Sequence, residues 1–356
     1  MKIVLLGHLH GFGGAEKSIV LLANQLAERG HDVTLISMTS DNNVYQMSEK
    51  VKYHFMDDKS KNKITTVMKR YMLLDKFFKN TKADVVISFW FQLGVIGMLL
   101  SKKYDFKIIY SERGDPTDKE YDGINGLIRK ITFPFFDGFV FQTKGARDCF
   151  DKKIADKSCV IHNAITIDKA ALHIPDKKDK TIVGVGRLHR QKNFPMLIKA
   201  FSLIADKYSD YKLIIYGDGE LREQLNELIM KLNLQNRVVL YGNTKDIYNK
   251  LLCAQMFVLS SDFEGMPNAL MEAMALGLPC ISTDCSPGGA AELIDNYENG
   301  ILVKIGDYKA LAAKIDEVLT DEKLKNKLSI NGQNILHTHS LAEIYNKWDA
   351  YIKDMK

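Results

Sequence analysis

Short apolar runs of strand length alternate with longer amphipathic segments through almost the whole chain. A first series lies at residues 2–7, 32–37, 51–56, 84–89, 107–112, 138–143 and 158–163, and a second at 181–186, 211–217, 238–242, 256–261, 279–284 and 300–304. The segments between most of them have the length and periodicity of helices. Near-continuous apolar strands separated by helices indicate parallel sheets that are covered on both faces. We therefore predict an α/β fold with two doubly wound, Rossmann-like parallel-sheet domains that face each other across a cleft.

A break in this alternation marks the domain boundary. The chain has 356 residues, of which 46% are hydrophobic, and this length exceeds what one typical core accommodates. Residues 165–180 are charged and contain a proline, so we predict a linker there, between a first domain at 1–164 and a second at 181–336. Residues 337–356 include an amphipathic helix that we expect to cross back and pack on the first domain.

Composition and charge restrict the location and the partners. No run of about 18 apolar residues occurs, so no helix is expected to span a membrane. The chain starts directly with a strand-like run, which predicts no signal peptide, and its five cysteines lack metal-ligand spacing, which favours reduced thiols in a cytoplasmic protein. The net charge is +5, and residues 1–172 hold 26 Lys and Arg against 20 Asp and Glu. We therefore expect the first domain to contact any anionic surface, and we expect no nucleic-acid partner.

The stretch EGMPNALME sets two carboxylates, Glu264 and Glu272, on either side of Pro267. Proline is favoured in the first turn of a helix, so we predict a helix that begins at Pro267 and ends at Gly277. Its start offers amide groups and the positive end of the helix dipole to an anion. Carboxylates beside a bound phosphate suit neutral sugar hydroxyls, although this stretch taken alone favours the simpler interpretation of a dipole-complementing Glu264 and a solvated Glu272.

Two glycine-rich loops are further candidates for ligand contacts. HLHGFGGAEKS follows the first strand and places Gly13 and Gly14 before a helix, where backbone can approach a phosphate closely. The spacing is not G-x-G-x-x-G, so it does not predict a dinucleotide site, and a plain tight turn explains it as well. DCSPGGAAEL places Gly288 and Gly289 before another helix as a candidate anion or sugar contact.

The loop GVGRLHRQKN is cationic and follows the first strand of the second domain. Arg187 can bind two oxygens of a diphosphate with its planar guanidinium, and Lys192 can act as a point charge beside it. A solvated basic loop is the alternative. Because all these loops leave the carboxyl ends of strands, we expect them to converge on one site.

These motifs together resemble the family 4 retaining glycosyltransferases, which have the GT-B architecture. The matching features, in order along nearly the whole chain, are GGAE at 13–16, GVGRLHRQKN at 184–193, YGDGELREQL at 216–225 and E-x7-E at 264–272. The resemblance implies that a nucleotide-diphosphate sugar binds mainly on the second domain and that the first domain is the acceptor side. Arg187 and Lys192 would hold its diphosphate with the amides of Asn268 and Ala269, in place of a metal, so no metal and no cofactor are expected.

The resemblance also implies contacts for the two sugars of the donor. Glu264 and the amides of Gly265 and Met266 would hold the transferred sugar, and Glu272 would hold the ribose hydroxyls. Glu264, Arg187 and Lys192 would therefore be the catalytic residues. Charge grows on the diphosphate as it leaves the anomeric carbon, and preorganised cations and amides lower the barrier to that step.

One stretch of the first domain departs from the family pattern. Gly13 and Gly14 would approach the phosphate from this domain, as the resemblance implies. Many members carry a histidine after the fifth strand, whereas this chain has SERGDP with Glu112 and Arg113. These two side chains are candidate contacts to the donor sugar or the acceptor. A lone loop histidine such as His8 is more often merely solvated.

The resulting functional prediction is a retaining glycosyltransferase of bacterial surface polysaccharide synthesis. It would move a hexose or N-acetylhexosamine from a nucleotide-diphosphate sugar, by family precedent a UDP-sugar, to a saccharide or lipid-linked saccharide. A sugar-nucleotide epimerase of similar two-domain form and a non-catalytic nucleotide-sugar-binding protein remain alternatives. Glycoside hydrolysis by Glu264 and Glu272 ranks lower, because hydrolases do not need paired phosphate loops.

A basic amphipathic segment in the first domain suggests where the acceptor is captured. Lys59 to Lys82 holds eight Lys or Arg residues and one acid, Asp75. Its apolar residues at helical spacing are Ile64, Val67, Met68, Tyr71, Leu74 and Phe78. Such a helix can lie on an anionic membrane, and an ordinary helix whose stripe faces the sheet is the alternative. We predict a peripheral enzyme at the inner face of the plasma membrane, which family members with lipid-linked acceptors support.

Overall fold

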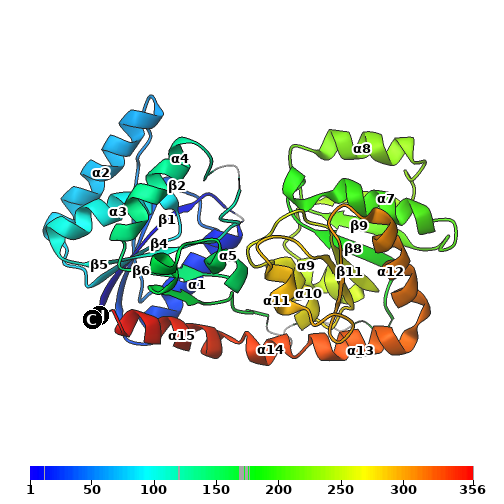
Figure 1. The fold of residues 1–356 in the computed structure, drawn as a ribbon. Coiled ribbons are helices and arrows are strands. Elements are labelled where there is room, and N and C mark those ends of the chain that lie inside the picture. The colour runs from blue at the N-terminus through cyan, green and yellow to red at the C-terminus, as the bar shows by residue number, and fades with distance from the viewer. Residues whose placement is uncertain (12, 119–120, 168–171, 173–174, 176, 356) are drawn as a thin grey trace. The chain divides into compact units, whose positions relative to one another are not determined.

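The computed structural model describes all residues except 12, 119–120, 168–171, 173–174, 176 and 356. Contacts between residues divide the chain into two compact units (Figure 1). The first unit comprises residues 1–163 and 342–356, and the second comprises residues 164–341. Part of the predicted linker lies outside the described residues. Ile165, at its start, is buried in the core of the second unit, and its amide donates to the carbonyl of His339 at 2.8 Å.

Seven parallel strands form the sheet of the first unit, in the order β3-β2-β1-β4-β5-β6-β7. The strands are β1 (Lys2–Leu9), β2 (Asp32–Asp41), β3 (Lys52–Met56), β4 (Val85–Ser88), β5 (Lys107–Ser111), β6 (Gly138–Phe141) and β7 (Ser158–Val160). Each coincides with a predicted apolar run. β1 pairs with β2 and β4, and seven of its eight residues are buried, which is why its run is apolar on both faces.

Helices pack on this sheet and bury the side chains of its strands. Leu74 of α2 and Leu93 of α3 share a core with Val4 of β1, and α1 packs against β1 and β2. The helical elements of the unit are α1 (Gly14–Glu28), α2 (Lys63–Asn80), α3 (Phe91–Tyr104), α4 (Ile124–Thr132), η2 (Phe133–Phe135), α5 (Lys144–Asp148), α6 (Lys152–Ala155) and α15 (Leu341–Lys353).

The terminal helix α15 packs on the first unit, as its apolar stripe predicts. Trp348 is buried and stacks on Phe89 with ring centroids 6.3 Å apart. The hydroxyl of Tyr351 accepts from the amide of Phe139 at 2.9 Å. Asp349 lies 2.7 Å from the Nε2 atom of His31. Residues more than 200 positions apart in sequence therefore complete one core.

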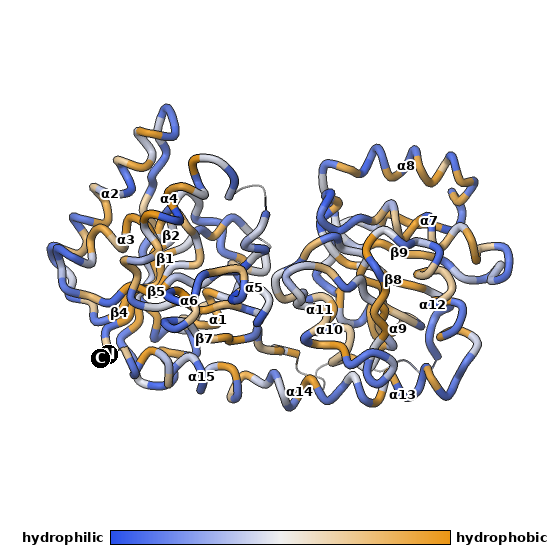
Figure 2. The backbone as a smooth tube through the Cα atoms, in the orientation of Figure 1, coloured by the Kyte–Doolittle hydropathy of each residue, from blue (hydrophilic) through white to orange (hydrophobic). Residues whose placement is uncertain are grey.

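The second unit repeats the same strand order with six parallel strands, β10-β9-β8-β11-β12-β13. The strands are β8 (Thr181–Val185), β9 (Lys212–Tyr216), β10 (Val238–Gly242), β11 (Met256–Leu259), β12 (Cys280–Thr283) and β13 (Ile301–Val303). Its helical elements are η4 (Arg190–Lys192), α7 (Phe194–Ile204), α8 (Arg222–Lys231), α9 (Ile247–Cys253), α10 (Asn268–Ala275), α11 (Gly289–Leu293), α12 (Tyr308–Thr320), α13 (Glu322–Gly332) and α14 (Ile335–Thr338). The hydrophobic strands lie inside each unit (Figure 2), so the predicted pair of Rossmann-like sheets is confirmed.

Candidate active site

The strand order of each sheet reverses beside its first strand, between β1 and β4 and between β8 and β11. In open parallel sheets, ligands bind outside the carboxyl ends of the strands at this reversal. In the second unit, the loop after β8 carries Arg187 and Lys192, and the loop after β11 carries Glu264. The fold therefore gathers the predicted catalytic residues at the expected place within the second unit.

Glu264 is held by side chains from both loops. Its Oε1 atom forms an ion pair with Nζ of Lys192, 72 positions away in sequence. The hydroxyl of Ser261 donates to the same oxygen at 2.7 Å, and Nε2 of Gln191 lies 3.4 Å from Oε2. Only 6% of Glu264 is exposed. The predicted sugar-binding acid and the predicted diphosphate-binding cation are thus direct partners in the structure.

The path of Lys192 depends on a glycine. A Cβ atom on Gly186 would lie 2.8 Å from Cε of Lys192, so a side chain at this position would force the lysine to shift from its path across the end of β8. Arg187 follows this glycine and is exposed, and its side chain makes no hydrogen bond with the residues that the structure describes. In this loop, Lys192 is thus a paired cation and Arg187 is a solvent-facing one.

The helix predicted to begin at Pro267 starts one residue later, so that boundary was wrong. Pro267 has a helical φ of −75° but an extended ψ of 96°, and it caps α10 instead of forming its first turn. Gly277, at φ +77°, ends the helix as predicted, because glycine tolerates this left-handed conformation. Glu272 lies on the second turn, and its Oε1 atom accepts from the hydroxyl of Tyr248 at 3.1 Å.

The loop before α10 touches the glycine loop before α11. A Cβ atom on Gly289 would lie 1.8 Å from the carbonyl oxygen of Gly265, so these backbones approach too closely for any side chain. Gly288 caps α11 at φ +90°. The other predicted donor-binding residues lie in the same loop and at the start of α10, namely Gly265, Met266, Asn268 and Ala269.

The first unit has a cavity of about 450 Å³ at its own strand reversal. His8 of β1, Trp90 and Gln92 after β4, and Glu112 and Arg113 after β5 line it. The sequence pointed only to the last two. His8 was expected to be solvated, whereas just 7% of it is exposed. The missed residues share one signal, because each lies at the end of an apolar run, where a parallel sheet places its ligands.

Glu112 is a buried carboxylate that several donors surround. Its Oε2 atom lies 3.2 Å from Nη2 of Arg129, and its Oε1 atom accepts from the amides of Arg113 and Gly114 at 3.1 and 3.2 Å. The hydroxyls of Tyr110 and Tyr121 each donate at 3.3 Å. This network stabilises the ionised form of the acid and fixes the loop after β5.

Arg113 is equally enclosed. Its guanidinium carbon lies 3.8 Å from the ring centroid of Phe89 and 5.7 Å from that of Trp348, and its Nη1 atom donates to Asn163 at 3.1 Å. Burial lowers the pKa of Arg113 to about 10, which leaves it charged at neutral pH. This side chain therefore joins the loop after β5 to the terminal helix.

Arg70 of α2 also lines the cavity, and it differs from the surface cation that the sequence suggested. Its Nε atom donates to the fully buried carboxylate of Asp58, and its Nη2 atom donates to Thr39 at 3.1 Å. Its Nη1 atom donates to Oε1 of Gln92 at 2.8 Å. A buried ion pair thus holds this arginine against the cavity, away from any flat anionic surface.

Gly13 and Gly14 lie at the start of α1, where the predicted phosphate contact would be. The hydroxyl of Tyr45 bonds both the amide and the carbonyl of Gly13 at 3.0 Å. A Cβ atom on Gly13 would lie 1.8 Å from Oε2 of Glu16, so this carboxylate folds over the helix start. The phosphate contact at this helix start stays a prediction.

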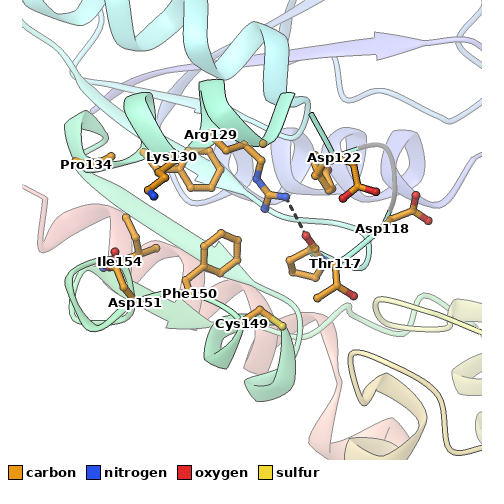
Figure 3. Close-up of a pocket in the computed structure, with 14 residues that line it drawn as sticks. Thr117, Asp118, Asp122, Arg129, Lys130, Pro134, Cys149, Phe150, Asp151 and Ile154 are labelled. Carbon is orange, nitrogen blue, oxygen red and sulfur yellow. Dashed lines mark hydrogen bonds between the residues drawn. The ribbon is translucent and has the colours of Figure 1, made fainter. Parts of the chain in front are cut away.

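A second cavity in the first unit, of about 300 Å³, lies beneath α4 (Figure 3). Arg129 extends into it, with its guanidinium carbon 3.7 Å from the ring centroid of Tyr121 and its Nη1 atom donating to the carbonyl of Pro116 at 3.0 Å. Acidic side chains at its edge belong to Asp118, Asp122 and Asp151. Arg129 also forms an ion pair with Glu112, which lines the cavity of about 450 Å³. The arginine therefore joins the two cavities of the first unit.

Three further properties of the described residues concern metal sites, disulfide bonds and membrane-spanning helices. Among the described residues, no group of three or more His, Cys, Asp and Glu side chains could hold a metal ion. All five cysteines are free thiols, and Cys280 and Cys285 are buried. In the described part of the chain, the helices fall short of the length and hydrophobicity that a bilayer crossing requires.

Two family models match the chain. Glycosyl transferases group 1 matches residues 167–335, and Glycosyltransferase Family 4 matches residues 12–169. The chain is 30% identical over 333 residues to N-acetylgalactosamine-N,N'-diacetylbacillosaminyl-diphospho-undecaprenol 4-alpha-N-acetylgalactosaminyltransferase of Campylobacter jejuni, with 88% of this chain and 89% of the relative covered.

Two further likenesses extend over the full length. The chain is 27% identical over 364 residues to GalNAc-alpha-(1->4)-GalNAc-alpha-(1->3)-diNAcBac-PP-undecaprenol alpha-1,4-N-acetyl-D-galactosaminyltransferase of C. jejuni, with 100% of this chain and 99% of the relative covered. The crystal structure of Anabaena HepE in complex with UDP and glucose has a TM-score of 0.81 at 19% identity, with 99% of this chain and 100% of that chain covered. This last likeness shows the fold.

Proposed function

The chain belongs to glycosyltransferase family 4, and from this we propose that it is a retaining, metal-independent transferase that uses a UDP-sugar and a lipid-linked saccharide acceptor. The transferred group would be a hexose or N-acetylhexosamine. In the reaction, the bond between the anomeric carbon and the diphosphate oxygen breaks, and its electron pair leaves with the nucleoside diphosphate. A bond from the anomeric carbon to an acceptor hydroxyl oxygen forms with the same configuration, and the hydroxyl proton passes to the leaving diphosphate. The setting would be bacterial surface polysaccharide synthesis.

The contact between Lys192 and Glu264 carries this proposal. Without a ligand, each neutralises the other at the strand reversal of the second unit. An incoming diphosphate would attract Lys192 and free the carboxylate of Glu264. That carboxylate, held in place by Ser261 and Gln191, would then accept hydrogen bonds from hydroxyls of the donor sugar. Arg187, exposed in the same loop, would add a second cation as charge grows on the leaving group.

The choice of donor and acceptor rests on the relatives. Two of them act on saccharides linked to undecaprenol through a diphosphate, and the structure with the same fold contains UDP. Metal independence rests on the cations already present, since Arg187 and Lys192 can neutralise a diphosphate without help. A family resemblance supports the retaining outcome.

The decisive experiment is transfer of label from UDP-glucose, UDP-galactose, UDP-N-acetylglucosamine and UDP-N-acetylgalactosamine to a lipid-linked saccharide in the presence of EDTA. We expect label in the lipid fraction. Lys192→Ala should lower the rate on the order of 10- to 1,000-fold, whereas Lys199→Ala, an exposed lysine of α7, should leave it unchanged.

Each other outcome of this assay contradicts a defined part of the proposal. Loss of transfer with EDTA and recovery with magnesium would contradict metal independence. Label in a second UDP-sugar without any acceptor would identify an epimerase, and donor binding without turnover would identify a binding protein. Inversion of the anomeric configuration in the product would contradict the retaining mechanism.

We also propose that the first unit meets the membrane through two helices. The predicted stripe of α2 is divided: Leu74 and Phe78 are buried against the sheet, whereas Ile64 and Met68 are 74% and 60% exposed. The C-terminal half of α2 therefore packs on the sheet in the ordinary way, whereas the N-terminal half exposes its apolar side chains to solvent. The exposed half begins beside Lys59, Lys61 and Lys63, all exposed, which suits an anionic surface.

The sequence did not point to α4, the second of these helices. Ile124, Leu127 and Ile131 are 77%, 59% and 58% exposed, and their spacing places them on one face. Hydrophobic residues are visible on both α2 and α4 in Figure 2. Arg70 of α2 and Asn125 of α4 line the same cavity of about 450 Å³, so both helices border that cavity.

Vesicle sedimentation tests the membrane contact. Binding to vesicles with anionic lipid should occur at low salt and be lost at high salt. Replacement of Lys61 and Lys63 by Ser should weaken vesicle binding roughly 30-fold, because each cation contributes about 1 kcal/mol to binding. The matched change of Lys199 and Lys231, exposed lysines of the second unit, should have no effect. Equal binding to neutral and anionic vesicles would refute the electrostatic part.

A further inference from the structure

Glu272, which the family resemblance assigns to the ribose of the donor, is held by a tyrosine from another helix. The hydroxyl of Tyr248 in α9 donates to its Oε1 atom at 3.1 Å, across 24 positions of sequence. A carboxylate only accepts hydrogen bonds, so the hydrogen of this hydroxyl is directed at Glu272. Tyr248 lies outside the four motifs on which the family resemblance rests. The contact therefore adds a residue that the motifs did not mark.

The fold brings Tyr248 to the edge of the sheet where the donor is proposed to bind. α9 follows β10, so its first turn lies at the carboxyl ends of the parallel strands, as the donor-binding loops do. The amide of Asp246 donates to the hydroxyl of Thr244 at 3.1 Å, and its carboxylate accepts from Nδ2 of Asn249 at 2.6 Å. These local bonds fix the first turn of α9, which carries Tyr248.

Both partners are anchored by the same core. The ring of Tyr248 packs against a buried cluster that includes Leu251 of α9 and both Leu270 and Met271 of α10, so these two helices lie side by side (Figure 1). Glu272 follows Met271 in α10 but stays partly exposed, so a ligand can reach it. The tyrosine hydroxyl and the carboxylate are thus held close together by two helices that share one core.

A carboxylate in a fixed orientation binds hydroxyl groups better than a freely rotating one. The side chain of a glutamate loses conformational entropy when a ligand orders it. The hydrogen bond from Tyr248 restricts the torsions of Glu272 before the donor arrives, so less entropy is lost on binding. The ribose is unchanged by the reaction at the anomeric carbon, so this gain should appear in donor affinity and not in kcat.

From this contact we infer that Tyr248 is a positioning residue for the donor, which orients Glu272 to accept hydrogen bonds from the ribose hydroxyls of a nucleoside diphosphate. This inference rests on the proposed transferase function. It implies that Tyr248 contributes to affinity only where the ligand has ribose hydroxyls to donate. A tyrosine that merely tied α9 to α10 would instead change the affinity for ligands with and without these hydroxyls to the same extent.

Calorimetry with two ligands tests the inference on the full-length protein. UDP carries both ribose hydroxyls, and in dideoxy-UDP both are replaced by hydrogen. Tyr248→Phe removes the hydroxyl and keeps the ring in the core, so it should raise the Kd of UDP about 5- to 10-fold, as for one hydrogen bond. The Kd of dideoxy-UDP should change by less than about twofold, because no ribose hydroxyl remains to be bound. Tyr211→Phe is the matched control and should leave both values unchanged, since Tyr211 precedes β9 at the amino ends of the strands.

A double-mutant cycle shows whether Tyr248 acts through Glu272. Glu272→Ala removes the carboxylate, so the further change Tyr248→Phe should alter the Kd of UDP by less than about twofold in that background. Steady-state kinetics supply a second readout. Tyr248→Phe should raise KM for the UDP-sugar about 5- to 10-fold and leave kcat within about twofold of its original value.

Equal weakening of UDP and dideoxy-UDP by Tyr248→Phe would overturn the inference, because Tyr248 would then have only a structural role. An unchanged Kd of UDP would overturn it as well. So would a further loss of affinity in the double variant, since Tyr248 would then act apart from Glu272. A failure of the proposed transferase function looks different: UDP binds with the expected dependence on its ribose hydroxyls, but no label reaches the lipid-linked acceptor.

Discussion

The buried neutral His8 should make the first unit sensitive to acid. In the unfolded chain a histidine takes up a proton near pH 6.5, whereas burial lowers the pKa of His8 in the folded protein to about 4. Between these values the unfolded state binds more protons, so stability falls as the pH drops from 6.5 towards 4. Above pH 6.5 the ring is neutral in both states and has no effect.

The size of this effect follows from the two pKa values. The full difference of about 2.5 units corresponds to about 3 kcal/mol, of which about 2 kcal/mol is already lost at pH 5. The charged and titratable groups near the ring are Arg70, His10 and Asp58. Arg70 and Asp58 form a buried ion pair that His8→Asn leaves in place. The variant therefore isolates the titration of one ring.

Urea unfolding followed by tryptophan fluorescence measures this loss in the correct unit, because Trp90 and Trp348 both lie in the first unit. Midpoints are compared at pH 7.5 and pH 5 for the unaltered protein and for His8→Asn. The unaltered protein should lose about 2 kcal/mol more than the variant over this interval. Equal losses in the two proteins would refute the reasoning, since His8 would then already be protonated or accessible to water in the folded state.

Three further predictions concern the second unit and the terminal helix. Glu264→Gln should lower kcat on the order of 100-fold while Glu272→Gln mainly raises KM for the donor, and steady-state kinetics that show the reverse would exchange their roles. Gly289→Ala should cost about 1–3 kcal/mol by overpacking, against about 1 kcal/mol for Gly288→Ala, whose Cβ meets nothing within 4 Å; equal melting temperatures would contradict the close backbone approach. Truncation after His339 should remove α15 and lower the melting temperature of the first unit by at least about 10 °C, and an unchanged value would contradict its part in the core.

Local pattern was sufficient for the sheets, because strand and helix formation depend on neighbouring residues. Every predicted apolar run is a strand, and Gly277 ends α10 as a left-handed cap. The boundary error at Pro267 concerns a ψ angle that the proline ring does not restrict. The family motifs likewise marked the loops at the strand reversal of the second unit, because each motif is a short stretch of neighbouring residues that directly follows a strand.

Side-chain partners were beyond the reach of the sequence, because they join residues that lie far apart along it. The amino-acid sequence does not show that Lys192 and Glu264 form an ion pair. It also does not show that Arg70 turns inward to Asp58 while Lys63 and Lys76 of α2 face water. The same holds for the exposed face of α4, since an amphipathic helix does not reveal which side the core covers.

His8 shows the division most clearly. The sequence by itself determined that a histidine stands at the end of the first strand, where a parallel sheet places its ligands. Only the tertiary structure decided its chemistry, by burying the ring and setting the carbonyl of Met38, 30 positions away, against Nδ1. Desolvation and hydrogen bonding depend on what surrounds a group in three dimensions, and those neighbours come from elsewhere in the chain.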